Sequence, residues 1–328
     1  MPEQAIDAEQ IRKVYGSKKD GVAALDGFDL SVAQGTVCGL LGPNGAGKTT
    51  AVRVLTTLAR LDHGTATVAG HDVATSPGRV RERIGLVGQN AAVDEVLNAR
   101  QNLIMFGRLF HLDARAARRR ADELLEQFDL TETGDRSVKK FSGGMRRRLD
   151  LAASLVLRPD VLFLDEPTTG LDPRGRNEMW AAVRTLVDMG TTVLLTTQYL
   201  DEADQLADRI AVMQAGRVIA EGTATELKTK AGGDHVEVVV REEAELDRAR
   251  TAVTEAVEAA ASVRAETRTV SAPVVDRVRA LDAALRKLDD DGIAIDDIGV
   301  RRPTLDDVFL TVTGEHVPAD GAEQEVAA

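Results

Sequence analysis

TVCGLLGPNGAGKTT, residues 36–50, joins an apolar run to a glycine-rich loop that matches the pattern G-x4-G-K-[ST]. Residues 36–41 predict a buried strand, and the residues after the loop predict the start of a helix. In that setting the glycines let backbone N–H groups turn inward around a phosphate, at the positive end of the helix dipole. This order of strand, loop and helix predicts an α/β domain that binds a nucleotide.

The side chains of this loop have separate expected roles. We expect Lys48 to reach the β- and γ-phosphates and the Thr49 hydroxyl to bind Mg²⁺. A glycine-rich turn without a ligand is the alternative, and the strand before the loop argues against it. The residues expected to contact the nucleotide in this stretch are Gly42, Asn44, Gly45, Ala46, Gly47, Lys48, Thr49 and Thr50.

A second apolar run, VLFL at residues 161–164, ends in Asp165 and Glu166. Parallel sheets bind ligands at the carboxyl ends of their strands, where these two carboxylates would emerge. We expect Asp165 to hold Mg²⁺ through water and Glu166 to polarise an attacking water. Such a run is common on its own, so this interpretation depends on the phosphate loop. Similar runs predict strands at 192–195 and 210–213.

Ser142-Gly143-Gly144 lies just before a helix that we predict over residues 146–157. A hydroxyl and free backbone amides at a helix start favour a second anion site, although an N-cap with a flexible turn is the simpler alternative. The sequence contains one phosphate loop and one such turn. We therefore interpret the two as halves of a shared pocket, in which two copies of the chain meet around each nucleotide.

The composition limits the classes of partner. The chain has 328 residues, 43% of them hydrophobic and 29% charged, which is typical of a folded protein of about two domains. Residues 236–328 hold 21 acidic and 11 basic side chains and therefore carry most of the net charge of −12. Nucleic acids are bound by clustered Lys and Arg and by aromatic side chains, and aromatic residues make up 3% here. We expect no nucleic-acid partner.

The sequence predicts neither a signal peptide nor a membrane span. Its first ten residues include acids and lack an apolar core, and no window approaches 18 apolar residues. The single cysteine, Cys38, excludes a disulfide framework. We expect an intracellular chain that does not itself cross a membrane.

Short apolar runs alternate with amphipathic ones over residues 1–230, the pattern of an α/β domain with a mostly parallel sheet. Residues 97–148 interrupt this pattern and predict a helical subdomain. A glycine-containing linker leads to a small α+β domain, residues 231–314, followed by an acidic tail, 315–328, that we expect to be disordered. In the small domain we predict strands at 236–240, 264–271 and 293–300, helices at 243–261 and 274–288, and a final helix from Pro303 with the apolar stripe Leu305, Val308, Phe309 and Val312.

Taken in order, these motifs resemble those of the ATP-binding subunit of an ABC transporter, and the resemblance covers residues 5–230. It implies an α/β P-loop NTPase of the ABC type, with a parallel-sheet core, a small antiparallel part and a helical subdomain. It also implies an ATPase that uses ATP and Mg²⁺, forms a nucleotide-sandwich homodimer and works with a multi-spanning membrane permease on a separate chain. The implied location is peripheral, on the cytoplasmic face of the cell membrane.

The same resemblance implies further site residues. Tyr15 matches the aromatic residue that stacks on adenine, and it is expected in the loop after the first strand. Gln89, in LVGQN, matches the glutamine that touches Mg²⁺ and senses the membrane partner. Residues 142–144 match the signature loop that contacts the γ-phosphate across the dimer. Asp172, in the segment 170–172, matches the loop that passes between the two subunits.

Two positions depart from the pattern of that family. Met145 stands where the signature commonly has Gln, which changes little because Ser142 and the backbone do the binding. Gln198, in TTQYLDEAD, stands where the family usually has a histidine that contacts the γ-phosphate. Glutamine keeps an amide donor but cannot titrate near neutral pH. We count Gln198 as a catalytic residue and expect weaker or differently tuned hydrolysis rather than lost binding.

Residues 196–204, together with PTLDDVFL at 303–310, resemble the daunorubicin-resistance branch of the family. Members of that branch are ATPases that pair with a separate permease and export drugs or lipids, so the resemblance implies a role in antibiotic resistance. The alternative is a soluble ATPase of the same superfamily that acts as a regulator or on ribosomes or DNA. Translation-type members resemble two cassettes in tandem and DNA-repair types carry a long coiled-coil insertion, and this sequence has neither.

Overall fold

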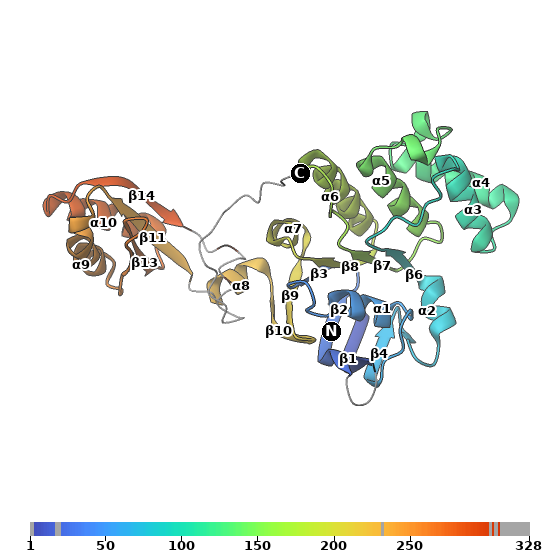
Figure 1. Ribbon diagram of the computed structural model, residues 1–328, viewed down its shortest axis with the longest axis horizontal. Helices are drawn as coiled ribbons and strands as arrows, with labels where there is room; N and C mark the ends of the chain where they lie inside the picture. The colour runs from blue at the N-terminus through green and yellow to red at the C-terminus, as the bar shows by residue number, and fades with distance from the viewer. Residues whose placement is uncertain (1–2, 17–20, 231–232, 302–303, 305–307, 309–328) are drawn as a thin grey trace, which may run out of the picture. The chain divides into compact units, whose positions relative to one another are not determined.

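The computed structural model describes residues 3–16, 21–230, 233–301, 304 and 308. The chain forms two compact units, Met1–Thr223 and Ala224–Ala328, each shown in Figure 1. The break between the units precedes α8 (Ala224–Lys230), whereas the sequence predicts a domain boundary after that helix. The domain limits given above remain a prediction.

The first unit contains two sheets and seven α-helices in the part of it that the structure describes. Its strands are β1 (Gln4–Tyr15), β2 (Val22–Ala33), β3 (Val37–Leu41), β4 (His63–Val68), β5 (His71–Asp72), β6 (Ile84–Val87), β7 (Val161–Asp165), β8 (Thr192–Thr197), β9 (Arg209–Gln214) and β10 (Arg217–Gly222). Its helices are α1 (Lys48–Leu55), α2 (Pro77–Arg83), α3 (Ala99–Leu109), α4 (Ala114–Gln127), α5 (Gly143–Ser154), α6 (Pro173–Asp188) and α7 (Leu200–Leu206).

Six strands form the central sheet, in the order β10-β9-β3-β8-β7-β6. Neighbouring strands run parallel except in the hairpin of β9 and β10. Every residue of β3, β7 and β8 is buried, because helices or a second sheet cover both faces of a parallel sheet. The predicted α/β fold with a parallel-sheet core is confirmed.

The side chains of β7 alternate between two hydrophobic cores. Val161 and Phe163 pack on one face of the central sheet, in a core shared with α1 and with the strands of the second sheet. Leu162 and Leu164 pack on the other face, in a core shared with α5 and α6. Because successive residues of a strand point to opposite faces, one short apolar run contributes to both cores.

The second sheet of this unit is antiparallel, with the strand order β2-β1-β4-β5. Figure 1 shows it in blue, on the side of the central sheet where α1 lies. It is the small antiparallel part that the fold class includes. Exposed residues interrupt the buried ones along β1 and β2, so these strands lack the continuous apolar run that marks β3 or β7 in the sequence.

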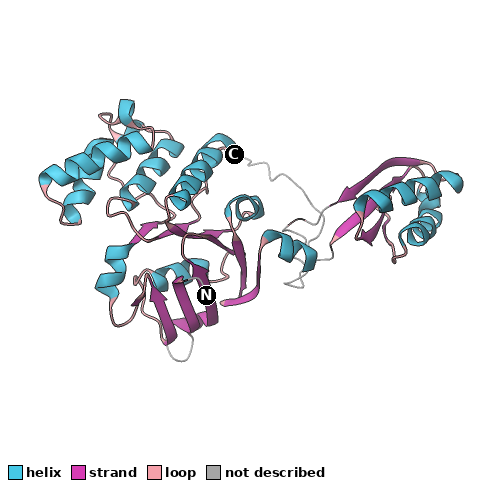
Figure 2. Cartoon of the chain, turned by 180° about the vertical axis from the view of Figure 1, so that it is seen from behind, coloured by secondary structure: helices cyan, strands magenta, loops and turns pink. Residues whose placement is uncertain are grey.

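Helices α3, α4 and the start of α5 lie within residues 97–148, the segment predicted to be helical. Figure 2 shows the helices in cyan on the face of the central sheet opposite the antiparallel sheet. The predicted limits of α5, 146–157, are wrong. The Ser142 hydroxyl accepts a hydrogen bond from the Met145 N–H at 3.2 Å, so the serine caps the helix and two glycines enter its first turn.

The second unit contains α8 and a four-stranded antiparallel sheet in the order β12-β13-β11-β14. Its elements are β11 (Asp234–Val240), α9 (Leu246–Val257), β12 (Ser262–Arg264), β13 (Thr269–Val274), α10 (Arg277–Asp290) and β14 (Ile295–Arg301). The single strand predicted over 264–271 is wrong, because a turn separates β12 from β13. Arg268 adopts a left-handed conformation in that turn, with φ of 51°, and its N–H donates to the Ala265 carbonyl at 3.1 Å.

Two predictions for the end of the chain lie outside the described residues. They are the final helix with its apolar stripe, of which Val308 is described and buried, and the tail 315–328. Within the described ranges, no helix has both the length and the apolar character that a membrane span needs.

Candidate functional site

The phosphate loop lies between β3 and α1, in the predicted order. Gly47, at the N-cap of α1, has φ of 104°, in the left-handed region that favours glycine. A Cβ atom at this position would also collide with the Ala24 carbonyl oxygen. Backbone conformation and crowding therefore both require glycine where the loop turns into the helix.

Lys48 is held under the phosphate loop, with 5% of its side chain exposed. Its Nζ atom donates hydrogen bonds to the carbonyl oxygens of Gly42, at 2.6 Å, and Pro43, at 3.0 Å. Burial lowers the pKa of Lys48, and the carboxylates of Glu166 and Asp165 oppose that shift. A buried ammonium group bonded to the loop's own backbone is in position to pair with a phosphate held by the loop.

Asp165, at the end of β7, is the centre of a polar cluster. Its Oδ1 atom accepts a hydrogen bond from the Thr196 hydroxyl at 2.6 Å and lies 3.3 Å from the Thr49 hydroxyl. Gln89 approaches the same threonine, with 3.5 Å between Nε2 and Oγ1. The three residues expected to bind Mg²⁺, namely Thr49, Gln89 and Asp165, therefore lie together in the folded chain.

The backbone of Glu166 is strained and firmly held. Its φ of 50° lies in the left-handed region, which costs a residue other than glycine about 1–3 kcal/mol. Its N–H donates to the carbonyl and to the hydroxyl oxygen of Thr196, both at 3.1 Å. Its Oε1 atom lies 3.8 Å from Lys48 Nζ. The surrounding structure thus fixes an unfavourable conformation that aims this carboxylate at the phosphate loop.

Sheet topology explains why residues far apart in sequence meet here. Strands β3, β8 and β7 are parallel neighbours, so their carboxyl ends share one edge of the sheet. The phosphate loop follows β3, Gln198 follows β8, and Glu166 follows β7. Strand β6 pairs with β7 and ends just before Gln89. This is the edge at which α/β sheets bind their ligands.

The signature turn, residues 142–144, lies beside the segment 170–172. A Cβ atom on Gly143 would lie 3.8 Å from the Leu171 side chain. The Asp172 carboxylate caps α6, because Oδ1 accepts a backbone N–H at 2.8 Å. The hydrogen bonds that Ser142 and Asp172 make in the described structure are these local caps, and neither joins the phosphate loop of the same chain.

Tyr15 is the last residue of β1, so its expected place in a loop after the strand is wrong. Its ring is 42% exposed, and Lys13 Nζ lies 5.5 Å from the ring centroid. An exposed ring of this kind is available to stack on a base. Its role with adenine stays a prediction.

Two charged residues of α5 that lie next to the site were not predicted from the sequence. Arg147 and Asp150 are 7% and 4% exposed, and Arg147 Nη2 lies 3.3 Å from the Glu166 carbonyl oxygen. Burial lowers the pKa of Arg147 and raises that of Asp150. Opposite charges three residues apart on one helix face were the available signal. Residues 146–148 are all arginines, so the sequence does not show which of the three faces inward and pairs with Asp150.

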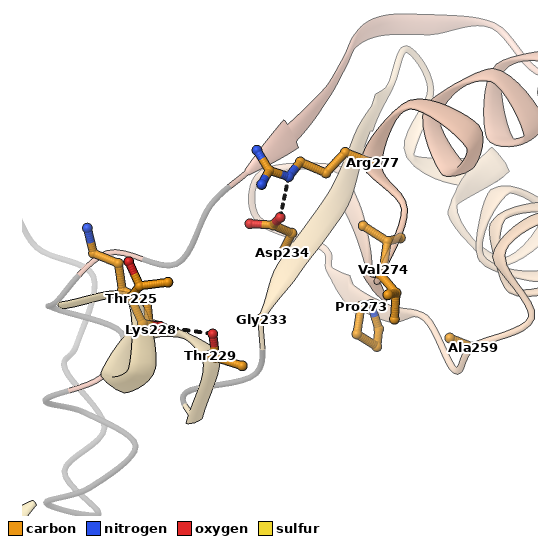
Figure 3. A pocket seen from close by; sticks show the side chains of 10 residues that line it. Thr225, Lys228, Thr229, Gly233, Asp234, Ala259, Pro273, Val274 and Arg277 are labelled. Atoms are coloured by element: carbon orange, nitrogen blue, oxygen red, sulfur yellow. Dashed lines mark hydrogen bonds and ion pairs between the residues drawn. The ribbon is translucent and has the colours of Figure 1, made fainter. Parts of the chain in front are cut away.

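The described part of the second unit has a cavity of its own. Figure 3 shows its cavity of about 700 Å³, where Asp234 Oδ2 and Arg277 Nε form an ion pair at 2.5 Å beside Pro273 and Val274. Throughout the described residues of the chain, no group of three or more His, Cys, Asp or Glu side chains is placed to hold a metal ion. Among the side chains that the structure describes, the one carboxylate that lines this cavity is Asp234, and it is paired with Arg277.

Comparisons with known proteins show the family to which the chain belongs. The ABC transporter family matches residues 25–169, and the family described as ATP-binding protein DrrA1-3-like, C-terminal domain, matches residues 222–313. The daunorubicin resistance ATP-binding protein DrrA2 of Streptomyces coeruleorubidus is 61% identical over 99% of both chains. The daunorubicin/doxorubicin resistance ATP-binding protein DrrA of Streptomyces peucetius is 49% identical, over 100% of this chain and 97% of that one. The structure of cbiO1 from Clostridium perfringens, part of the ABC transporter complex cbiONQ, covers 70% of this chain and 92% of its own, with 27% identity and a TM-score of 0.63.

Proposed function

Because the chain belongs to the ABC transporter ATP-binding proteins of the daunorubicin-resistance type, we propose that two copies of it enclose ATP and Mg²⁺ and drive a separate membrane permease. As a member of that family it is an ATPase that powers export. The observation that carries the proposal is the meeting of Lys48, Thr49, Asp165 and Glu166 at one edge of the sheet. Membership of the family disfavours the alternative of a soluble factor that acts on ribosomes or DNA.

In the proposed reaction, Lys48 and the loop amides bind the β- and γ-phosphates of ATP. Glu166 holds a water molecule and accepts its proton as the water oxygen attacks the γ-phosphorus and ADP leaves. The 3.8 Å between Glu166 Oε1 and Lys48 Nζ supports this division of roles, because the base and the phosphate-binding cation then face the same small volume. The Asp165 carboxylate stays bonded to Thr196 and keeps β7 and β8 in register at the site.

The residues around Asp165 fit Mg²⁺. Their donor set of a carboxylate, a hydroxyl and an amide oxygen, from Asp165, Thr49 and Gln89, is the hard-oxygen set that this ion prefers. Mg²⁺ commonly uses one or two protein carboxylates together with substrate phosphates, which agrees with a site that has Asp165 at its centre. When bound, the ion would neutralise charge on the phosphates.

We propose that the signature turn of one copy completes the nucleotide site of the other. The turn offers the N-terminal end of α5, a 12-residue helix that begins with two glycines. It lies beside the segment 170–172, so a partner copy would meet both segments together.

The proposed export substrate is drug-like or lipid-like, in line with the resistance that the relatives' names state. The proposed location is the cytoplasmic face of the membrane.

An apolar groove of about 230 Å³ in the first unit is the proposed docking site for the permease. It is lined by Leu58, Phe106 and Phe110 along with Ala92 and Asp150. Leu58 and Phe110 are 64% and 42% exposed, which is unusual for large apolar side chains that meet at one place. Ala92 belongs to the segment that follows Gln89, so an occupant of the groove would touch a neighbour of the proposed Mg²⁺ site.

Fractionation of host cells tests this docking site. We expect the parent chain in the membrane pellet, from which alkaline carbonate releases it, and the double variant Leu58→Glu/Phe110→Glu in the supernatant. The reason is that two carboxylates in an apolar interface carry a large desolvation cost. Met189→Glu is the matched control, since Met189 is 61% exposed and lies outside the groove. Retained ATPase activity shows that the variants are folded, and pelleting of the double variant would contradict the assignment.

Gln198 is proposed to donate its amide to the γ-phosphate. A hydrogen bond to a charged group contributes about 1.5–3 kcal/mol, so Gln198→Ala should lower kcat roughly 10- to 100-fold. Gln198→His should lower it less, because imidazole also offers a donor. Steady-state hydrolysis by the purified full chain measures both. If the alanine variant turns over like the parent, residue 198 does not contact the phosphate.

A further inference from the structure

The guanidinium group of Arg147, on α5, bonds to three backbone carbonyls of two different loops. Nη1 donates to the Gly88 oxygen at 2.6 Å and Nε to the Pro167 oxygen at 2.8 Å. Nη2 donates to the Glu166 oxygen at 3.3 Å. With 7% of the side chain exposed, water has little access to these bonds. One buried side chain thus joins the loop after β6 to the loop after β7.

The three carbonyls lie next to the residues proposed to act on ATP. The Gly88 carbonyl and the Gln89 nitrogen share one planar peptide, so holding that oxygen sets the plane from which Gln89 departs. The Glu166 carbonyl belongs to the residue proposed as general base, whose left-handed backbone needs external support. Its N–H is held by Thr196 and its carbonyl by Arg147.

Asp150 holds the guanidinium group from the next turn of α5. Its Oδ2 atom lies 3.6 Å from Arg147 Nη1, and its Oδ1 atom accepts the Ala92 N–H at 2.8 Å. The pair therefore contacts the segment around Gln89 on both sides: Arg147 bonds to Gly88 before it, and Asp150 bonds to Ala92 after it. The helix that carries the pair begins at the signature turn.

We propose that Arg147, supported by Asp150, is a positioning residue for ATP hydrolysis that fixes Gln89 and Glu166 relative to the helix of the signature turn. The proposal rests on the roles given above to Gln89 and Glu166. Arginine suits this task because it presents five N–H donors in a rigid planar fork, whereas a lysine ammonium is a compact group on a flexible stem. A buried guanidinium needs acceptors for its N–H groups in any case. What points to positioning is the place of these acceptors, because one belongs to Glu166 and another directly precedes Gln89.

Turnover and ATP binding by the full chain, measured separately, test the proposal. In Arg147→Lys the charge remains but the fork is lost, so we expect kcat to fall at least tenfold while KM and the Kd for ATP stay within twofold. Arg118→Lys is the matched control, because Arg118 lies exposed on α4, and it should behave like the parent. A parent-like kcat for a folded Arg147→Lys, or a change confined to KM, would overturn the proposal.

A second variant covers the case in which Arg147→Lys does not fold. Arg147→Gln/Asp150→Asn removes both buried charges and so leaves neither unpaired, which is the main hazard of breaking a buried ion pair. We expect this variant to melt and to bind ATP like the parent and yet to lose at least tenfold in kcat. Recovery of the parent's kcat would show that the pair contributes to stability alone.

Glu166→Gln, measured beside these variants, distinguishes two kinds of failure. Slow turnover by Glu166→Gln with parent-like Arg147→Lys overturns the positioning role and leaves the proposed site intact. Parent-like turnover by Glu166→Gln overturns the proposed catalytic site itself, whatever the Arg147 variants do.

Discussion

Replacing Glu166 by Gln is expected to slow ATP hydrolysis by about 100-fold or more while ATP affinity stays within twofold of the parent. A positioned general base contributes about 10²- to 10⁴-fold to a rate, and the amide of glutamine cannot accept the proton of the attacking water. The change is nearly isosteric, so the contacts that hold the backbone at Thr196 and Arg147 should remain. Because the triphosphate persists, the variant should also accumulate as an ATP-bound dimer.

Single-turnover hydrolysis, nucleotide binding and size-exclusion chromatography with ATP measure the three parts of this result. Glu126→Gln is the matched control, because Glu126 is an exposed glutamate of α4, away from the site. Near-parent turnover by Glu166→Gln would remove this residue from the catalytic role. A monomer that retains ATP would argue against the shared nucleotide site.

Lys48→Ala is expected to weaken ATP binding roughly 100-fold or more, and hydrolysis at any moderate ATP concentration should disappear with it. The ammonium group is proposed to pair with two phosphates, and charge-assisted hydrogen bonds contribute about 1.5–3 kcal/mol each. Its removal also leaves the Glu166 carboxylate, 3.8 Å away, without a neutralising neighbour on the side where the phosphates bind.

Calorimetric titration with ATP measures the loss, and thermal unfolding without nucleotide checks the fold. Lys287→Ala serves as the control, because Lys287 belongs to α10 of the second unit and pairs there with Glu255 and Asp291. If Lys48→Ala binds ATP like the control, the phosphate loop does not bind the nucleotide in the proposed way.

The central strands of the sheet could be predicted from the sequence. The apolar runs at 36–41, 161–164 and 192–195 became β3, β7 and β8, with limits that differ by one or two residues. A strand of a parallel sheet is buried on both faces, so it appears in the sequence as a continuous apolar run. That run can be recognised without knowing which strands lie beside it.

Predictions failed where one local feature outweighed another, or where the pattern in the sequence was weak. The strand expected over 264–271 is broken because Arg268 adopts a left-handed conformation that its residue type does not announce. Helix α5 begins early because the Ser142 cap outweighs the poor helix propensity of the two glycines after it. The limits of β1 and β2 were not predicted at all, because alternating burial is a weaker pattern.

What the sequence determined by itself is the chemistry that neighbouring residues encode. The phosphate loop is such a case, because the conformation of Gly47 and the place of Lys48 at the start of α1 follow from eight consecutive residues. The two carboxylates after an apolar run are another, since a strand end delivers both to one edge of the sheet.

The tertiary structure alone decided which of these pieces meet. Thr49, Gln89 and Asp165 come together because β6 pairs with β7 and β7 with β8, and β8 in turn with β3. Strand order is chosen by the packing of whole faces, so it leaves no mark on any single segment. The three hydrogen bonds of the Arg147 guanidinium depend on the tertiary structure in the same way. Its donors and their acceptors lie as many as 59 residues apart, and they meet only when the two hydrophobic cores form.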